Sequence, residues 1–384
     1  MRITALLAGL ALAVSVAQAQ AETVVKVGVT AAITGPAAAL GIGAKNAFSL
    51  MPDHIGDIKV QIIVLDDATD TTKAVVNTNK LINEEQVDVM VGSSTSPQAL
   101  AMINPIFEAK VPLISLAASA SIVEPMDEKR HWVFKTAAND SVMADGIARH
   151  AALKGIKTMG FIGFDDSYGE SWLQQFKRFA ERDGIQLVAV ERYSRQDTSV
   201  VGQVLKVMAA KPDAILIAGS SAPAAMPHVE LKARGYKGVI YQTHGSASSD
   251  FLKVGGAALN GGYVSVGPNL VWSQLPDSNP TKAVSATLVP RYEEKFGKNS
   301  WSNFAGQAYD VWLILSAAIP VAIKQAQPGT PAFRAALRDA IEGIKDLPAN
   351  AGVFSFSPTD HAGLDARARV IVQIVDGKWK YDAQ

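Results

Sequence analysis

Short apolar runs alternate with amphipathic stretches along the first third of the chain. The runs are VVKVGVTAA (24–32), KVQIIVLDD (59–67), VDVMVG (87–92) and VPLISLAAS (111–119). Their Val and Ile content and near-continuous apolar character are typical of strands buried in a parallel sheet. The stretches between them, such as TKAVVNTNKLINEE (72–85) behind a capping Asp70 or Thr71, have the period of an amphipathic helix. This alternation predicts β-α-β units.

The same organisation starts again near residue 157, although the sequence itself does not repeat. The second set of runs is KTMGFIGF (157–164), IQLVAVERY (185–193), DAILIAG (213–219) and GVIYQTHG (238–245). Helices are expected from about Tyr168 to Arg182 and over SVVGQVLKVMAA (199–210) and AAMPHVELKARG (224–235). Two similar α/β lobes, each a doubly wound parallel sheet, are the simplest arrangement that accommodates both sets.

The last third of the chain has a different character. Residues 281–345 are mostly helical in pattern, and ARVIVQIVDGKWKYD (368–382) predicts two strands that turn at Asp376-Gly377. Late helices and late strands together indicate that the chain returns to both lobes.

We therefore place chain crossings near Ala138, Gly267 and Asp346. The first lobe is then expected to contain residues 22–138 plus 268–345. The second is expected to contain residues 139–267 plus 346–384.

The N-terminus (1–21) has the three parts of a secretory signal peptide. Arg2 supplies positive charge, residues 6–16 form an apolar core that is short for a membrane span, and small residues follow. We expect cleavage after Ala19 or Ala21 and release of the mature protein into the periplasm. No second stretch is expected to span a membrane.

Composition narrows the classes of function. The chain has no cysteine, which excludes disulfides, thiolate metal sites, a cysteine nucleophile and a lipid-modified cysteine. Its 36 Lys and Arg balance its 36 Asp and Glu, so no net charge favours nucleic acid or an anionic membrane. No serine-nucleophile elbow, phosphate-binding loop or zinc-hydrolase motif is present, and the six histidines lack metal-ligand spacing. We expect no catalytic residues, cofactor or metal.

A hydroxyl-rich turn is the most distinctive polar feature. The segment GSSTSP (92–97) joins the strand at 87–92 to a predicted helix, with Ser96 as the expected N-cap and Pro97 in the first helical position. The free N–H groups of that helix end, with hydroxyls beside them, suit a carboxylate or a phosphate. Capping and turn formation alone would also account for these residues.

Several stretches resemble the leucine/isoleucine/valine-type family of periplasmic solute-binding proteins, also called type I periplasmic binding proteins, which serve ABC importers. The similar stretches are VKVGVTAAITGPAAALG (25–41), IIVLDDATDTTKAVVNTNKLI (62–82), VGSSTSPQALAMINPIFEAKVPLISLAAS (91–119) and DDSYGES (165–171). The resemblance covers nearly the whole mature chain. It implies two lobes joined by a hinge, an interlobe ligand cleft that closes on its ligand, a membrane permease as partner, and a monomeric receptor.

The resemblance also assigns candidate binding residues. Members of the family hold the carboxylate of an amino acid with hydroxyls and backbone N–H groups from two loops of the first lobe. By position, these loops contribute Ser93, Ser94 and Thr95, and Ala117, Ala118 and Ser119. Oriented dipoles and hydrogen bonds of this kind can hold the charge without a formal cation.

Some positions depart from the amino-acid binders of the family. His244 stands where they carry an acidic partner for the ligand's ammonium, Ser220 replaces a tyrosine, and Leu40 replaces an aromatic residue. Tyr168 remains as an aromatic wall. Because an ammonium buried without a carboxylate partner is costly, we expect a small carboxylate that lacks an α-ammonium. An aromatic acid fits best, of the aryl 2-oxo acid, benzoate or hydroxycinnamate type.

Other functions stay open on the sequence alone. If His244 only caps a loop, the chain could bind a branched-chain or other amino acid. A ligand-sensing subunit of a membrane receptor would use the same cleft, and permease and ATPase genes beside this gene would argue against it. A secreted α/β hydrolase would need a serine elbow with an aligned histidine and acid.

Overall fold

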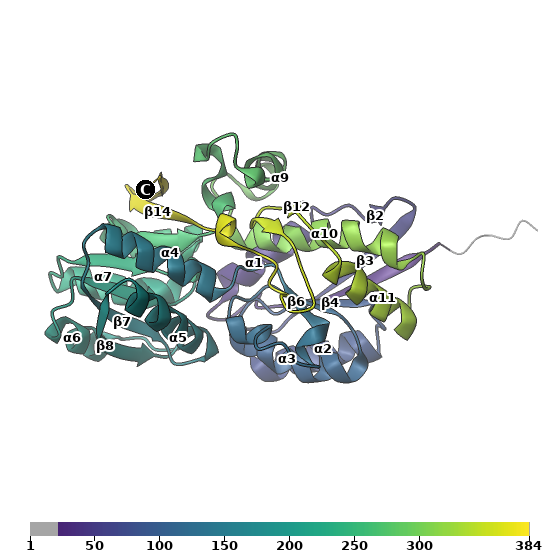
Figure 1. The fold of residues 1–384 in the computed structure, drawn as a ribbon, viewed down its shortest axis with the longest axis horizontal. Helices are drawn as coiled ribbons and strands as arrows, with labels where there is room; N and C mark the ends of the chain where they lie inside the picture. The colour runs from purple at the N-terminus through teal and green to yellow at the C-terminus, as the bar shows by residue number, and fades with distance from the viewer. Residues whose placement is uncertain (1–21, 384) are drawn as a thin grey trace, which may run out of the picture.

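The computed structural model describes residues 22–383, and the expected signal peptide (1–21) lies outside these described residues. Two α/β lobes lie side by side along the long axis of the molecule (Figure 1). Each lobe is built on its own mainly parallel sheet. The predicted fold class, two doubly wound lobes, is confirmed.

The first lobe holds a six-stranded sheet. Its strands are β1 Val24–Ala31, β2 His54–Ile55, β3 Ile58–Asp66, β4 Val89–Gly92, β5 Leu113–Ser115 and β6 Val133–Lys135. They are ordered β2-β3-β1-β4-β5-β6, and only the β2–β3 pair is antiparallel. The helices around this sheet are α1 Ala38–Phe48, α2 Thr71–Asn83, α3 Ser96–Ala109, α10 Asn303–Ala322 and α11 Pro331–Glu342.

The second lobe holds a seven-stranded sheet. Its strands are β7 Thr158–Phe164, β8 Gln186–Tyr193, β9 Ala214–Ala218, β10 Val239–Gln242, β11 Tyr263–Val266, β14 Val370–Val375 and β15 Lys378–Asp382. They are ordered β15-β14-β11-β10-β9-β7-β8, and the late strands β14 and β15 form an antiparallel edge. The helices are α4 Asp140–Leu153, α5 Ser167–Arg182, α6 Val201–Ala209, α7 Ala225–Ala233 and α8 Ser249–Gly255.

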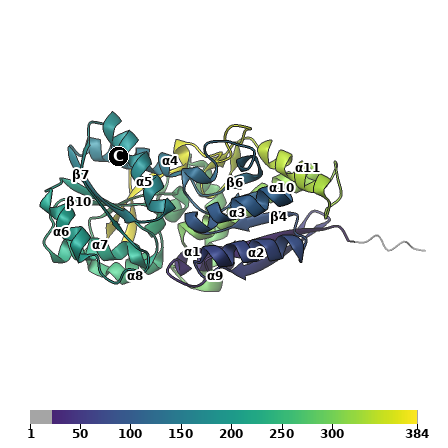
Figure 2. The ribbon, with the colours of Figure 1, turned by 90° about the horizontal axis from the view of Figure 1, so that it is seen from below.

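Burial on both faces explains the apolar runs of the strands. In β4, Val89 and Val91 belong to the apolar cluster shared with α1 and α10, whereas Met90 packs in the cluster of α2 and α3. The two helix layers lie on opposite sides of the sheet (Figures 1 and 2). Successive residues therefore face different layers, and every position of the strand is apolar or small.

The two sheets share one topology, and this topology positions the site. The first strand of each set, β1 or β7, has the second strand on one side and the third on the other. In open α/β sheets, ligands bind at the carboxyl ends of the strands beside this change of direction. The loops that follow β4, β7, β9 and β10 are consequently the places to look for binding residues.

The late part of the chain returns to both lobes. The helices α9 Pro280–Phe296, α10 and α11 match the predicted helical block, and the β14–β15 turn falls between Val375 and Lys378, as predicted. A short antiparallel pair, β12 Leu347–Pro348 with β13 Val353–Phe354, follows α11.

The third crossing lies later than Asp346. Asn350 still donates from its backbone N to Asp310 Oδ1 in α10 at 2.8 Å, and the ring of His361 still stacks on Phe134 of β6. The segment that follows β12 is therefore packed on the first lobe. The chain joins the second lobe only as it approaches β14.

Two further expectations need revision. The short strands β2, β6, β11, β12 and β13 were not predicted, because two to four residues show too little pattern. Helix α10 is, contrary to expectation, long and apolar enough to cross a membrane by length and composition alone. However, 67% of its apolar window is buried inside the fold, as in the core helix of a soluble protein.

Candidate functional site

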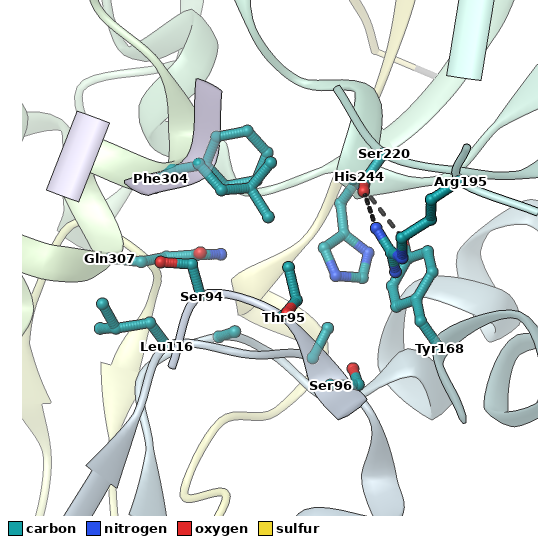
Figure 3. Close-up of a pocket in the computed structure, with 14 residues that line it drawn as sticks. Ser94, Thr95, Ser96, Leu116, Tyr168, Arg195, Ser220, His244, Phe304 and Gln307 are labelled. Atoms are coloured by element: carbon teal, nitrogen blue, oxygen red, sulfur yellow. Dashed lines mark hydrogen bonds between the residues drawn. The ribbon is translucent and has the colours of Figure 1, made fainter. Parts of the chain in front are cut away.

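A cavity lies between the lobes, where the carboxyl ends of the two sheets face each other. Its empty space is about 340 Å³, including the part that opens to solvent. Figure 3 shows that side chains from both lobes point into it.

The first-lobe wall is formed by the hydroxyl-rich turn after β4. Ser94, Thr95 and Ser96 all line the cavity (Figure 3). The N-cap of α3 is Thr95 rather than the predicted Ser96, and no side-chain hydrogen bond closes this cap. Ser94 Oγ is buried and has no hydrogen-bond partner among residues 22–383. Ser96 Oγ accepts a bond from Ser119 N at 3.2 Å, and Thr95 Oγ1 donates to Gln98 Oε1.

Some residues of the two expected carboxylate loops do not line the cavity. Ser93 turns away from it and donates its hydroxyl to Asp67 Oδ2 at 2.7 Å. Ser119 pairs its hydroxyl with Ser121 Oγ at 2.8 Å, and Ala117 is absent from the lining as well. Ala118 and Leu40 do line it. In the second loop the lining residues alternate, whereas in the first only Ser93 is turned away.

The second-lobe wall contains three of the predicted residues, Tyr168, Ser220 and His244. Tyr168 stands in the first turn of α5, and its hydroxyl donates to Thr243 Oγ1 at 2.8 Å and accepts from Gly245 N at 3.2 Å. With the hydroxyl occupied in this way, the ring of Tyr168 can offer a ligand an apolar surface.

His244 is buried and unpaired. It is only 2% exposed, and neither ring nitrogen has a hydrogen-bond partner within the described part of the chain. Burial and, to a smaller extent, the positive charge of Lys135 together lower the pKa of His244 to about 3. The ring is therefore neutral at pH 7, with one nitrogen that can donate and one that can accept.

Arg195 is a pocket residue that the sequence did not identify. It follows β8, and its guanidinium pairs with Asp166 through Nε and donates from Nη1 to Ser220 Oγ at 2.7 Å. Its Cζ lies 4.1 Å from the centre of the Phe164 ring. The cavity therefore contains one formal cation, and this cation is already paired.

Further residues that the sequence did not identify close the first-lobe side. Leu116 precedes the second predicted loop, and Phe304 and Gln307 come from the first turns of α10. Figure 3 places Gln307 beside Ser94, with Phe304 on the same side. The end of a strand is a sequence signal for Leu116, but nothing local marks the start of a late helix as part of this cavity.

A buried charge pair supports the wall from behind. Lys135, at the end of β6, donates from Nζ to the backbone oxygens of Ala118 and Ser119, the latter at 3.2 Å, and to Asn139 Oδ1 at 2.7 Å. Burial lowers the pKa of Lys135 and raises that of Asp140, and the attraction between the two groups opposes both shifts. This pair lies where the chain first crosses between the lobes.

No carboxylate faces the cavity from any described lining side chain. The acid next to it, Asp166, is bound to Arg195 and also caps α5 by accepting from Tyr168 N at 2.8 Å. The cavity therefore offers a neutral imidazole, hydroxyls and one guanidinium, and its fixed charges are balanced without a ligand.

Comparisons with known proteins agree with this architecture. A family model described as periplasmic binding protein matches residues 24–378. The structure of an extracellular ligand-binding receptor from Rhodopseudomonas palustris HaA2 is 42% identical and superposes with a TM-score of 0.91, covering 94% of this chain and 99% of that one.

Two more distant proteins have more specific names. Leu/Ile/Val-binding protein BraC3 of Rhizobium johnstonii is 24% identical over 346 residues, which are 87% of this chain and 88% of that protein. A solute-binding protein of an ABC transporter from Rhodopseudomonas palustris BisB5, solved with 3,4-dihydroxybenzoic acid, is 22% identical with a TM-score of 0.78. It covers 94% of this chain and 96% of that one.

Proposed function

Because the chain belongs to the periplasmic binding protein family, whose type I members have the same fold, we propose that it is the periplasmic receptor of an ABC importer for a small carboxylate without an α-ammonium. An aromatic acid is the preferred ligand, of the aryl 2-oxo acid, benzoate or hydroxycinnamate type. The protein captures it as a monomer and delivers it to a membrane permease, and it performs no catalysis.

The proposed ligand class rests on one observation: none of the described side chains that line the cavity is a carboxylate. An α-amino acid brings one anion and one cation. Ser94 Oγ, buried and unpaired, suits the anion, but the cation would find a neutral histidine and a guanidinium. Burying an ammonium there leaves it uncompensated, and the cost is several kcal/mol.

The remaining groups suit an oxygen substituent and a ring. His244 can donate a hydrogen bond to a keto or hydroxyl oxygen, and the rings of Tyr168 and Phe304 bound the cavity on opposite lobes. The dihydroxybenzoic acid in the Rhodopseudomonas palustris BisB5 protein shows that a protein of this fold can hold an aromatic acid. That likeness supports the proposal without deciding the ligand.

The second candidate ligand is a branched-chain amino acid, in view of the name of BraC3. Isothermal titration of the mature protein with matched pairs separates the two. The pairs are phenylpyruvate with phenylalanine, benzoylformate with phenylglycine, and 4-methyl-2-oxopentanoate with leucine. We expect each oxo acid to bind at least tenfold more tightly than its amino acid, and the aromatic acids more tightly than the aliphatic one. Tighter binding of leucine or phenylalanine would overturn the proposal.

A further inference from the structure

A second cluster of polar side chains lies in the first lobe, away from the ligand cavity. His131 belongs to a short 3-10 turn before β6, Glu342 is the last residue of α11, and His361 lies in the loop after β13. None of the three lines the cavity between the lobes. The spacing of the histidines along the chain does not predict this cluster, because its members come from three separate segments.

The distances within the cluster match those between the ligands of one metal ion. Glu342 Oε2 is 3.1 Å from His361 Nε2 and 3.7 Å from His131 Nδ1. One ligand atom from each residue lies within 4.8 Å of the others. Tetrahedral Zn²⁺ with bonds of about 2.0–2.1 Å separates its ligand atoms by roughly 3.3–3.4 Å. Small side-chain adjustments would bring all three atoms onto one ion.

The surroundings of His361 fix the nitrogen that would bind. His361 Nδ1 lies 3.0 Å from Val133 O and 3.2 Å from Arg130 O, and both of these carbonyls can only accept. The proton of the neutral ring is therefore on Nδ1, and Nε2 presents a lone pair to the carboxylate of Glu342. Two acceptors at 3.1 Å need a cation or a second proton between them. Metal-binding histidines are commonly held in this way by a backbone carbonyl.

Packing holds the ring in place as well. His361 has no exposed side-chain surface, and its ring stacks on Phe134 with 4.0 Å between the centroids. The His131 ring also stacks on His361, with 5.9 Å between the centroids, and keeps 37% of its side chain exposed. The site is thus rigid on one side and open to solvent on the other, which leaves a coordination position for water.

We propose that His131, Glu342 and His361 form a Zn²⁺ site that ties the end of α11 and the loop after β13 to the segment before β6. Two imidazoles and a carboxylate are ligands that this ion commonly takes. The positive Arg338 also faces His131, but its guanidinium is paired with Asp339. This proposal revises the expectation of no metal site and is independent of the ligand in the cleft.

The test uses the mature chain stripped with EDTA and titrated with Zn²⁺ alone. We expect one tight site per chain, a higher melting temperature with Zn²⁺, and, with Co²⁺ as a second probe, the visible absorption of a tetrahedral ion. His131→Asn should weaken Zn²⁺ binding by more than the 10- to 100-fold that loss of an outer partner costs. Because His131 is partly exposed, its variant should melt like the metal-free wild type.

The control is His54→Asn, which removes an exposed histidine that lies beside Asp53 and Glu22. It should bind one Zn²⁺ with wild-type affinity. The proposal is overturned if the wild type has no saturable site, or if His131→Asn binds Zn²⁺ as the wild type does. A protonated His361 paired with Glu342 would then account for the 3.1 Å contact.

Discussion

The wall from the first lobe and the wall from the second lobe differ in how far their polar groups are already paired. On the first, Ser94 Oγ is buried without a partner, and no described lining residue is charged. On the second, Arg195 is charged but bound to Asp166 and Ser220, while His244 is neutral and unpaired. The first wall can therefore hydrogen-bond an anion. The second can discriminate between ligands, because an ammonium group would find no partner there.

This difference assigns affinity and specificity to separate lobes. A hydrogen bond from Ser94 to a carboxylate would form with any ligand that carries one. In the proposed function His244 would meet the substituent next to that carboxylate, where a neutral ring can hydrogen-bond an oxygen but cannot neutralise an ammonium. Variants of each wall test this division.

His244→Glu should have the largest effect. It places a carboxylate in a position that is 2% exposed, so an anionic ligand would meet a like charge at low dielectric. We expect the affinity for phenylpyruvate to fall by more than about 100-fold, equivalent to about 2.7 kcal/mol, and the preference to shift toward phenylalanine. Calorimetric titration of both ligands measures the shift.

The neutral variant His244→Gln is the control, since it removes the imidazole without adding charge. It should lose about tenfold in affinity, the effect of one hydrogen bond, and keep its preference for the oxo acid. Melting curves of both variants show whether each is folded. If folded His244→Glu still prefers phenylpyruvate, His244 does not face the substituent next to the carboxylate.

Ser94→Ala should have the next largest effect. A hydrogen bond to a charged group contributes on the order of 1.5–3 kcal/mol, so the affinity for phenylpyruvate should fall roughly ten- to hundred-fold. Because Ser94 Oγ has no partner among the described residues of the free protein, the stability of the fold should change little. Titration calorimetry and urea unfolding give the two quantities.

Its neighbour in the chain supplies a matched control. Ser93→Ala removes a hydroxyl that bonds Asp67 outside the cavity, so it should reduce stability and leave affinity unchanged. Ser119→Ala, which the resemblance alone would place in the carboxylate site, should also leave affinity unchanged, because its hydroxyl bonds Ser121. Equal losses of affinity in all three variants would contradict the assignment of Ser94.

The contrast between Ser93 and Ser94 also shows what the sequence can predict. The apolar runs predicted eight strands of the two sheets, because both faces of those strands are covered and the pattern is local. Strand ends and the resemblance together located Ser94, Thr95, Tyr168, Ser220 and His244. Which of two adjacent hydroxyls faces the cavity depends on the local backbone dihedral angles, and the hydrophobic pattern of the sequence does not specify these angles.

Residues brought in by tertiary packing were not predictable in this way. Arg195 follows β8 and resembles any surface arginine until Asp166 and Ser220, 29 and 25 residues away, are placed beside it. Phe304 and Gln307 reach the cavity only because α10 packs on α1 of the first lobe. The histidine–glutamate cluster in the first lobe depends on packing in the same way.

Acidification should reduce the stability of the wild type through the buried His244, and this effect should be smaller than those of the substitutions above. Its pKa is lowered to about 3 in the folded protein, against about 6.5 in the unfolded chain. Between these values the unfolded chain binds a proton that the folded protein does not, so this residue reduces stability as the pH falls below about 6.5. From pH 7.5 to pH 5, we expect the wild type to lose about 2 kcal/mol more than His244→Gln.

Urea unfolding of both proteins at the two pH values checks this difference. Ser94→Ala should follow the wild type, because the wall to which it belongs has no titratable group in the cavity. If His244→Gln and wild type lose stability in parallel, folding does not lower the pKa of His244, and the argument that its buried ring stays neutral fails.

The smallest effect concerns shape, and it follows from the position of the two walls on different lobes. Thr95, Tyr168 and His244 are each at most 5% exposed, so we expect the lobes to move apart before a ligand contacts these side chains. The bond from Ala120 N to Ser171 Oγ at 3.3 Å links the lobes at this edge in the closed form. A ligand that touches both walls therefore stabilises the closed form, because it makes more contacts there than in the open form.

We expect small-angle scattering to show a small decrease in the radius of gyration at saturating phenylpyruvate. Ser94→Ala should reach the same compact state at a higher concentration, since its second wall is intact. Identical profiles with and without bound ligand, with binding confirmed by calorimetry on the same sample, would show that the lobes do not need to close.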